Sequence, residues 1–125
     1  MKTALVQAAA VFCLGLAVLH LFFWRMFRWR EQLARVSRAN AGVMQVMNIV
    51  LTGCLLMFGV VLAVHTEAMT ATPLGRTLLA ALAGLWLLRA ALQRPFFAST
   101  GARVTAGFEA LFVVGALLHA LPLVL

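Results

Sequence analysis

The sequence predicts an all-α membrane protein in which four transmembrane helices form an up-and-down antiparallel bundle. Of its 125 residues, 65% are hydrophobic and only 10% are charged, which lies outside the composition of soluble domains. The chain contains four apolar runs, and a helix needs roughly 20 such residues to cross a hydrocarbon core of about 30 Å. Because short connections join the runs, we expect residues 1–125 to form a single four-helix transmembrane domain.

Charges and turn residues delimit the expected transmembrane helices. These cover about residues 4–24, 41–65, 77–93 and 104–124. The first run has no charge before Arg25 and is too long for the apolar region of a cleaved signal peptide, so we expect a retained helix. Thr72-Pro73 marks a turn after the second run, and Arg94-Pro95 ends the third. None of the runs alternates with period two, so helices rather than barrel strands satisfy their backbone in lipid.

The distribution of arginine predicts the orientation in the membrane. Five arginines lie in the first connection, at Arg25, Arg28, Arg30, Arg35 and Arg38. Three more surround the third connection, at Arg89, Arg94 and Arg103. Cytoplasmic connections are enriched in Lys and Arg, so we expect both of these inside and both termini outside, in a bacterial-type inner (plasma) membrane. The formal net charge of +7 then serves orientation and contact with lipid head groups, and we expect no nucleic-acid partner.

Few polar side chains remain inside the predicted helices, and they lie at one depth. They are His20, Gln45, Asn48, Arg89 and Glu109. Counting from the cytoplasmic helix ends at 1.5 Å per residue places all five roughly 6 to 12 Å below the membrane boundary. Each helix contributes at least one of them, which predicts a polar cluster near the cytoplasmic leaflet.

Charged residues at this depth usually pair or face water, which predicts how the cluster is arranged. We expect Arg89 and Glu109 to form an ion pair, with Gln45 and Asn48 satisfying remaining donors and His20 completing the ring. Such a cluster either specifies helix packing or forms a pocket for a lipid head group, a quinone or a small organic anion. The alternative to an ion pair is that the Arg89 side chain snorkels to the lipid head groups.

The sequence lacks the usual patterns of a cofactor site or a hydrolase. His65 and His119 are expected on the outer side at unequal depths, which is poor geometry for a haem, and adding Glu67 gives no tight metal-ligand spacing. We therefore expect no cofactor and no metal. No Ser/His/Asp array, phosphate-binding glycine loop or zinc-protease helix is present, so an enzyme is the less favoured interpretation.

The first third of the chain contains a set of residues that is also found in other membrane proteins. His20 lies near the end of the first predicted helix, Met26-Phe27 and Trp29 follow it, and Asn40-Ala41-Gly42 opens the second helix. This arrangement resembles a widespread group of uncharacterised four-helix bacterial membrane proteins of about this length. The resemblance implies the four-helix architecture and an interest in His20 and Asn48, and it implies no activity.

Three classes of function are compatible with these features. The first is a small membrane protein whose cluster binds or transports a small polar or amphipathic molecule, with Arg89 as anion anchor and Glu109 as its partner or proton carrier. In that case His20, Gln45 and Asn48 orient the ligand, and a transport path requires a homodimer because four helices enclose little volume. The alternatives are a structural or accessory subunit of a larger membrane complex and, less favoured, a haem b or quinone redox protein.

The expected topology can be tested by labelling single cysteines in intact cells. In a background lacking Cys13 and Cys54, Ala34→Cys should be inaccessible to an impermeant thiol reagent, whereas Thr70→Cys should react. Labelling of both after the membrane is permeabilised is the control. The reverse pattern would contradict the orientation and the leaflet assigned to the cluster.

Overall fold

The computed structural model describes residues 1–125, and every regular element in it is a helix. Four helices are long and apolar enough to cross a membrane: α1 (Lys2–Leu21), α4 (Arg38–Val64), α6 (Pro73–Ala91) and α8 (Ala102–Val124). Short helices lie between them: α2 (Phe23–Met26), α3 (Trp29–Gln32), η1 (Leu33–Arg35), α5 (Thr66–Ala71), α7 (Gln93–Phe97) and η2 (Ala98–Thr100). The predicted all-α class with four apolar spans is confirmed, and the chain is a small four-span integral membrane protein.

The chain packs as two compact units, each of which is described by itself. The N-terminal unit comprises Ala10–Val61, and the C-terminal unit comprises Met1–Ala9 and Leu62–Leu125. The first contains most of α1 and α4, and the second contains α6 and α8 together with the start of α1 and the end of α4. That both belong to one domain stays a prediction.

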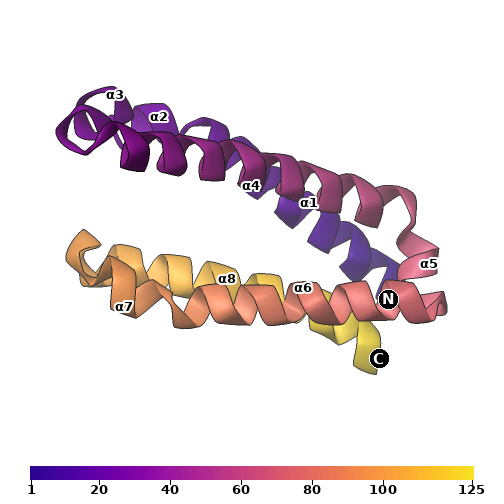
Figure 1. The fold of residues 1–125 in the computed structure, drawn as a ribbon. Coiled ribbons are helices and arrows are strands. Elements are labelled where there is room, and N and C mark those ends of the chain that lie inside the picture. The colour runs from indigo at the N-terminus through magenta and orange to yellow at the C-terminus, as the bar shows by residue number, and fades with distance from the viewer. The chain divides into compact units, whose positions relative to one another are not determined.

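In the N-terminal unit, α1 and α4 run antiparallel and lie close together (Figure 1). Gly59 of α4 faces Leu14 of α1, and Asn48 of α4 lies opposite His20 of α1. Residue numbers therefore increase along α4 in the direction in which they decrease along α1, as in an antiparallel pair. A Cβ atom at Gly59 would lie 2.6 Å from Cδ2 of Leu14 and 3.3 Å from the carbonyl oxygen of Ala10. The missing side chain therefore allows the close helix contact that packing in lipid requires.

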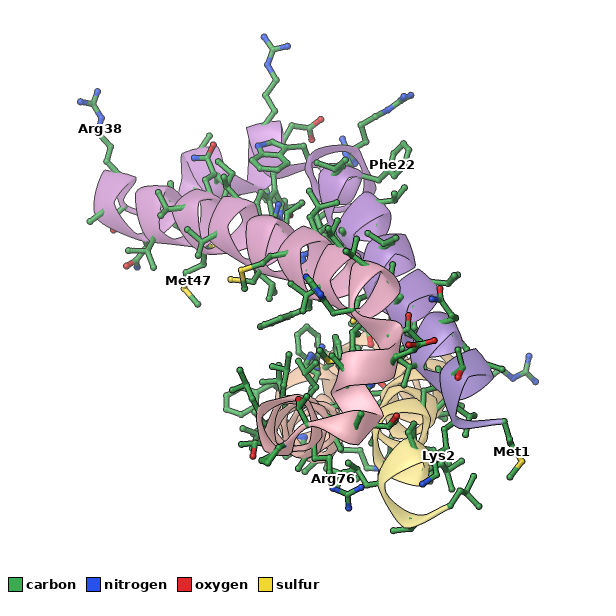
Figure 2. All side chains as sticks on the ribbon, turned by 90° about the vertical axis from the view of Figure 1, so that its right-hand side faces the viewer. Met1, Lys2, Phe22, Arg38, Met47 and Arg76 are labelled. Atoms are coloured by element: carbon green, nitrogen blue, oxygen red, sulfur yellow. The ribbon has the colours of Figure 1, made fainter.

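The basic segment after α1 folds onto its own aromatic side chains. Arg28 adopts a left-handed backbone conformation, with φ of 48°, which reverses the chain between α2 and α3. Trp29 is buried as a result, with its ring centroid 5.2 Å from Trp24 and 6.3 Å from Phe23. The arginines stay at the surface, and Figure 2 shows Arg38 extending away from the start of α4.

In the C-terminal unit, α6 and α8 form a second antiparallel pair (Figure 1). The ring of Trp86 on α6 stacks on Phe112 of α8, with an interplanar angle of 3° and 6.0 Å between centroids. Near the opposite end of the pair, Nη2 of Arg76 donates to the carbonyl of Leu123 (3.3 Å), and Arg76 lies beside the carboxyl end of α8 in Figure 2. The antiparallel arrangement thus extends along the whole of α6.

The helix limits differ from the predicted ones where side chains cap a backbone. The third long helix begins at Pro73 rather than about residue 77, because the Thr72 hydroxyl accepts a hydrogen bond from the Gly75 N–H (3.0 Å) and Pro73 fits the first helical position. The second begins at Arg38 rather than residue 41, since Ser37 Oγ accepts from the Asn40 N–H (3.3 Å). The expected turn at Thr72-Pro73 is therefore the start of a helix.

At Gly75 the backbone of α6 approaches the backbone of α5 closely, and this contact predicts the effect of a substitution on stability. A Cβ atom there would overlap the carbonyl oxygen of Ala68 and lie 2.5 Å from the Cα of Met69, and backbone atoms cannot yield as a flexible side chain can. Gly75→Ala should lower the free energy of unfolding by about 1–3 kcal/mol. Gly84→Ala, on the same helix with nothing within 4 Å, should be neutral or stabilising by up to about 1 kcal/mol.

Reversible unfolding in mixed detergent micelles, followed by circular dichroism, would measure both variants. Equal effects of the two substitutions would contradict the tight contact between α5 and α6.

Candidate functional site

The five polar residues predicted to form a cluster are divided between the two units. His20, Gln45 and Asn48 belong to the N-terminal unit, and Arg89 and Glu109 belong to the C-terminal unit. The contacts within each group distinguish side chains whose hydrogen bonds are made inside the chain from those that have an unused donor or acceptor.

His20 and Asn48 form a reciprocal link between α1 and α4. Nδ1 of His20 and Oδ1 of Asn48 are 2.9 Å apart, and the Asn48 Nδ2 donates to the backbone carbonyl of His20 (3.2 Å). The His20 ring also stacks on Phe23, with 4.2 Å between centroids, and the Thr52 hydroxyl donates to the carbonyl of Asn48 (2.7 Å). Asn48 is buried, so this link joins the two helices with hydrogen bonds inside the apolar layer.

Gln45 does not take part in that link. Its Nε2 donates to the carbonyl of Ala41, four residues earlier in the same helix (3.2 Å). The spacing of Gln45, Asn48 and Thr52 places them on one helix face, and the structure gives them different partners.

The predicted ion pair between Arg89 and Glu109 is wrong. Glu109 instead accepts a hydrogen bond from Nε of Arg94, at 2.8 Å. The sequence count treated residues 77–93 as one straight helix, but α6 ends at Ala91 and the following α7 packs against α8, where it presents Arg94 to Glu109. This pair lies partly at the protein surface, since the Arg94 side chain is 70% exposed and that of Glu109 is 30% exposed.

Arg89 lies between two aromatic rings instead of beside a carboxylate. Its guanidinium carbon is 4.3 Å from the ring centroid of Phe112 on α8 and 4.9 Å from that of Phe97 on α7. The negative faces of aromatic rings stabilise a cation by about 0.5–2 kcal/mol, and more strongly away from water. The two rings account for the position of the charge, but Nη1 of Arg89 is buried and has no hydrogen-bond partner.

Gln93 is a buried polar residue on the same segment, and it is absent from the predicted cluster. It is 2% exposed, and its Oε1 is buried without a hydrogen-bond partner. It follows Arg89 by four residues, a spacing that places two side chains on one helical face and could have indicated it. We call Arg89, Gln93, Phe97 and Phe112 the Arg89–Gln93 site.

A threonine ladder fixes one wall of this site. The Thr105 hydroxyl donates to the backbone carbonyl of Phe97 (2.9 Å), and its oxygen lies 3.2 Å from the hydroxyl of Thr100. The Thr100 hydroxyl also donates to that carbonyl (2.7 Å). These bonds hold the turn between α7 and α8, so the ring of Phe97 is presented to Arg89 by an ordered backbone.

His119 and His65, the two histidines expected on the outer side, have different surroundings from each other. His119 is fully buried, with Nδ1 2.7 Å from the carbonyl of Gly115 and its ring tilted against Trp86. His65 is exposed at the junction of α4 and α5, beside an open depression of about 510 Å³ that also includes Gln7 and Glu67. No group of three or more His, Cys, Asp or Glu side chains in the chain is arranged to hold a metal ion.

Comparisons with known proteins give no match, so the function is interpreted from the architecture. No protein-family model matches the chain, and neither a curated protein nor a solved structure matches it. The resemblance of the first third to uncharacterised four-helix membrane proteins is therefore supported only by the four apolar spans.

The corrected pairing of Glu109 predicts the outcome of two double-mutant cycles. Combining Arg94→Gln with Glu109→Gln should reveal a coupling of about 0.5–1 kcal/mol, because the pair is in contact but partly exposed. Arg89→Gln and Glu109→Gln should be additive within about 0.3–0.5 kcal/mol. Unfolding free energies in micelles would give both values, and a larger coupling for Arg89 would restore the pair predicted from the sequence.

Proposed function

We propose that this small four-span membrane protein binds the anionic group of a small amphipathic molecule at the Arg89–Gln93 site. One observation carries the proposal, the buried and unpartnered Nη1 of Arg89. A buried donor without a partner costs about 1–3 kcal/mol, and more when it is charged, so a ligand that supplies an acceptor would bind favourably.

The charges around the site favour an anion. Glu109, the acidic residue of this region, is engaged with Arg94, and Arg103 adds another positive charge at the start of α8. Arg89 therefore has no internal counter-ion. A carboxylate or phosphate group can supply one, and it can accept two hydrogen bonds from the edge of a guanidinium group.

The aromatic rings prepare Arg89 for this role. The guanidinium carbon of Arg89 lies over the ring faces of Phe97 and Phe112, which stabilise its positive charge without supplying an oxygen or nitrogen acceptor. The rings therefore hold the cation without a carboxylate partner. Phe97 is 39% exposed, so one ring of the site lies at the surface of the protein.

The proposal includes the location and the other predicted residues. We place the site at the cytoplasmic leaflet of an inner membrane, with both termini outside, because arginines concentrate in the first and third connections. Participation of His20, Gln45 and Asn48 in the same ligand site, and transport of the ligand, stay predictions.

A structural role is the second candidate, and it is favoured by the link between His20 and Asn48. Its hydrogen bonds join two helices and use both side chains, as a packing device in lipid would. A subunit of a larger membrane complex needs no more than this, and the site at Arg89 distinguishes the two candidates.

Lipid retention measured by native mass spectrometry would test the proposal. Protein in detergent should retain phosphatidylglycerol in preference to a diacylglycerol with the same acyl chains, and Arg89→Gln should reduce that retention about tenfold, which corresponds to about 1.4 kcal/mol. Arg103→Gln is the matched control, because it removes one exposed arginine from the same end of the C-terminal unit.

Arg103→Gln should change retention by less than about twofold, since exposed charges contribute little. Equal losses from the two variants would show general electrostatic attraction and would contradict a site at Arg89. Thermal unfolding of both variants controls for loss of the fold.

A further inference from the structure

An open depression lies where the start of α1 meets the junction of α4 and α5, within the C-terminal unit (Figure 1). Its volume is about 510 Å³, and its polar lining consists of Thr3, Gln7, His65, Thr66 and Glu67. We call it the Gln7–Glu67 depression. Pockets that hold small molecules have volumes of roughly 300–1,000 Å³, so its size suits a small molecule rather than a bare ion.

Gln7 joins the two sides of this depression. Its Nε2 donates to the carbonyl of Ala63 (3.2 Å) and to the hydroxyl of Thr66, which itself donates to the carbonyl of Leu62 (2.8 Å). These bonds use the donors of the Gln7 amide and fix its orientation. No hydrogen bond inside the chain involves its Oε1, so this oxygen remains an acceptor for a bound molecule.

Glu67 is the one acidic residue of the chain whose side chain has no ion pair. The other two, Glu31 and Glu109, each contact an arginine, at N–O distances of 2.5 and 2.8 Å. No Lys or Arg lines the depression, although the chain has 10 of them. A carboxylate without a counter-ion favours a cationic ligand, and a phospholipid head group is disfavoured because its phosphate would have no cationic partner there.

The lining suits an organic ammonium group better than a metal ion. Transition-metal sites use three or four protein ligands, whereas no group of three or more His, Cys, Asp or Glu side chains in the chain is arranged to hold a metal. A primary ammonium group instead has three N–H donors and needs only oxygen acceptors. Glu67, Gln7 and Thr3 each bring one to the depression.

We propose that the Gln7–Glu67 depression binds a small water-soluble primary amine, whose ammonium group donates to the side-chain oxygens of Glu67, Gln7 and Thr3. The depression lies at the ends of the long helices, since α1 begins at Lys2 and α4 ends at Val64, so a soluble amine reaches it without crossing the apolar layer. This binding goes beyond the proposed function and does not depend on it.

Nuclear magnetic resonance of the full-length protein labelled with carbon-13 histidine would test the proposal in detergent. His65 lines the depression, whereas His20 belongs to the other unit and His119 is buried in α8, so both serve as internal controls. Butylammonium chloride should shift the His65 ring signal in a saturable manner. Tetramethylammonium keeps the charge but has no N–H, and it should bind about fivefold more weakly. Equal affinity for the two ions, or no saturable shift, would overturn the proposal.

Glu67→Gln should weaken butylammonium binding about fivefold, because it replaces the carboxylate with a neutral amide of similar size. The Glu67 side chain is exposed and makes no ion pair, so the fold should persist, and thermal unfolding would verify this. Glu31→Gln removes the same charge from the N-terminal unit and should change the affinity by less than about twofold. Equal losses from the two variants would show general attraction by charge and contradict the site. Arg89→Gln should leave the His65 shift unchanged, so this proposal and the proposed function can fail separately.

Discussion

The absence of water from the hydrocarbon layer is the constraint on which the rest of this structure depends. Every backbone group in the four long spans must bond within its own segment, which leaves helices as the solution. Hydroxyl groups inside the spans follow the same rule. Thr52 donates to the carbonyl of Asn48, Thr77 to that of Pro73, and each thereby satisfies its donor without a partner helix.

Under this constraint, polar side chains in the molecule either bond to one another or keep an atom without a partner. His20 and Asn48 are bonded to each other across α1 and α4, so their polarity contributes to helix association. Arg89 and Gln93 retain a buried donor and a buried acceptor, which cost free energy in the isolated chain. The difference between a closed and an open set of hydrogen bonds separates packing residues from the proposed binding residues more clearly than depth in the membrane does.

The sequence was sufficient for the architecture because composition and run length determine it. The four spans, their order and the antiparallel pairing follow from apolar runs joined by short connections. Their limits depended on single hydroxyl groups, at Ser37 and Thr72, which cap helices that apolarity alone places later in the chain.

The candidate site was predictable only in part, since counting residues gives depth but not direction. Arg89 and Glu109 have similar depth, but the end of α6 at Ala91 and the start of α7 redirect the chain so that Arg94 reaches Glu109. Gln93 ends the predicted helix 77–93 and was not among the predicted cluster residues, whereas its side chain is buried. A linear count cannot predict such a change of direction.

The pairing of Glu109 with Arg94 has a chemical consequence for Arg89. A carboxylate bound to Arg89 would neutralise its charge and occupy its N–H donors, and the site would then have no use for an anion. Phe97 and Phe112 stabilise the same charge through their ring faces, and Nη1 of Arg89 keeps no hydrogen-bond partner. A cation held on aromatic rings, with the carboxylate of Glu109 engaged by Arg94, is therefore the arrangement that the proposed anion site at Arg89 requires.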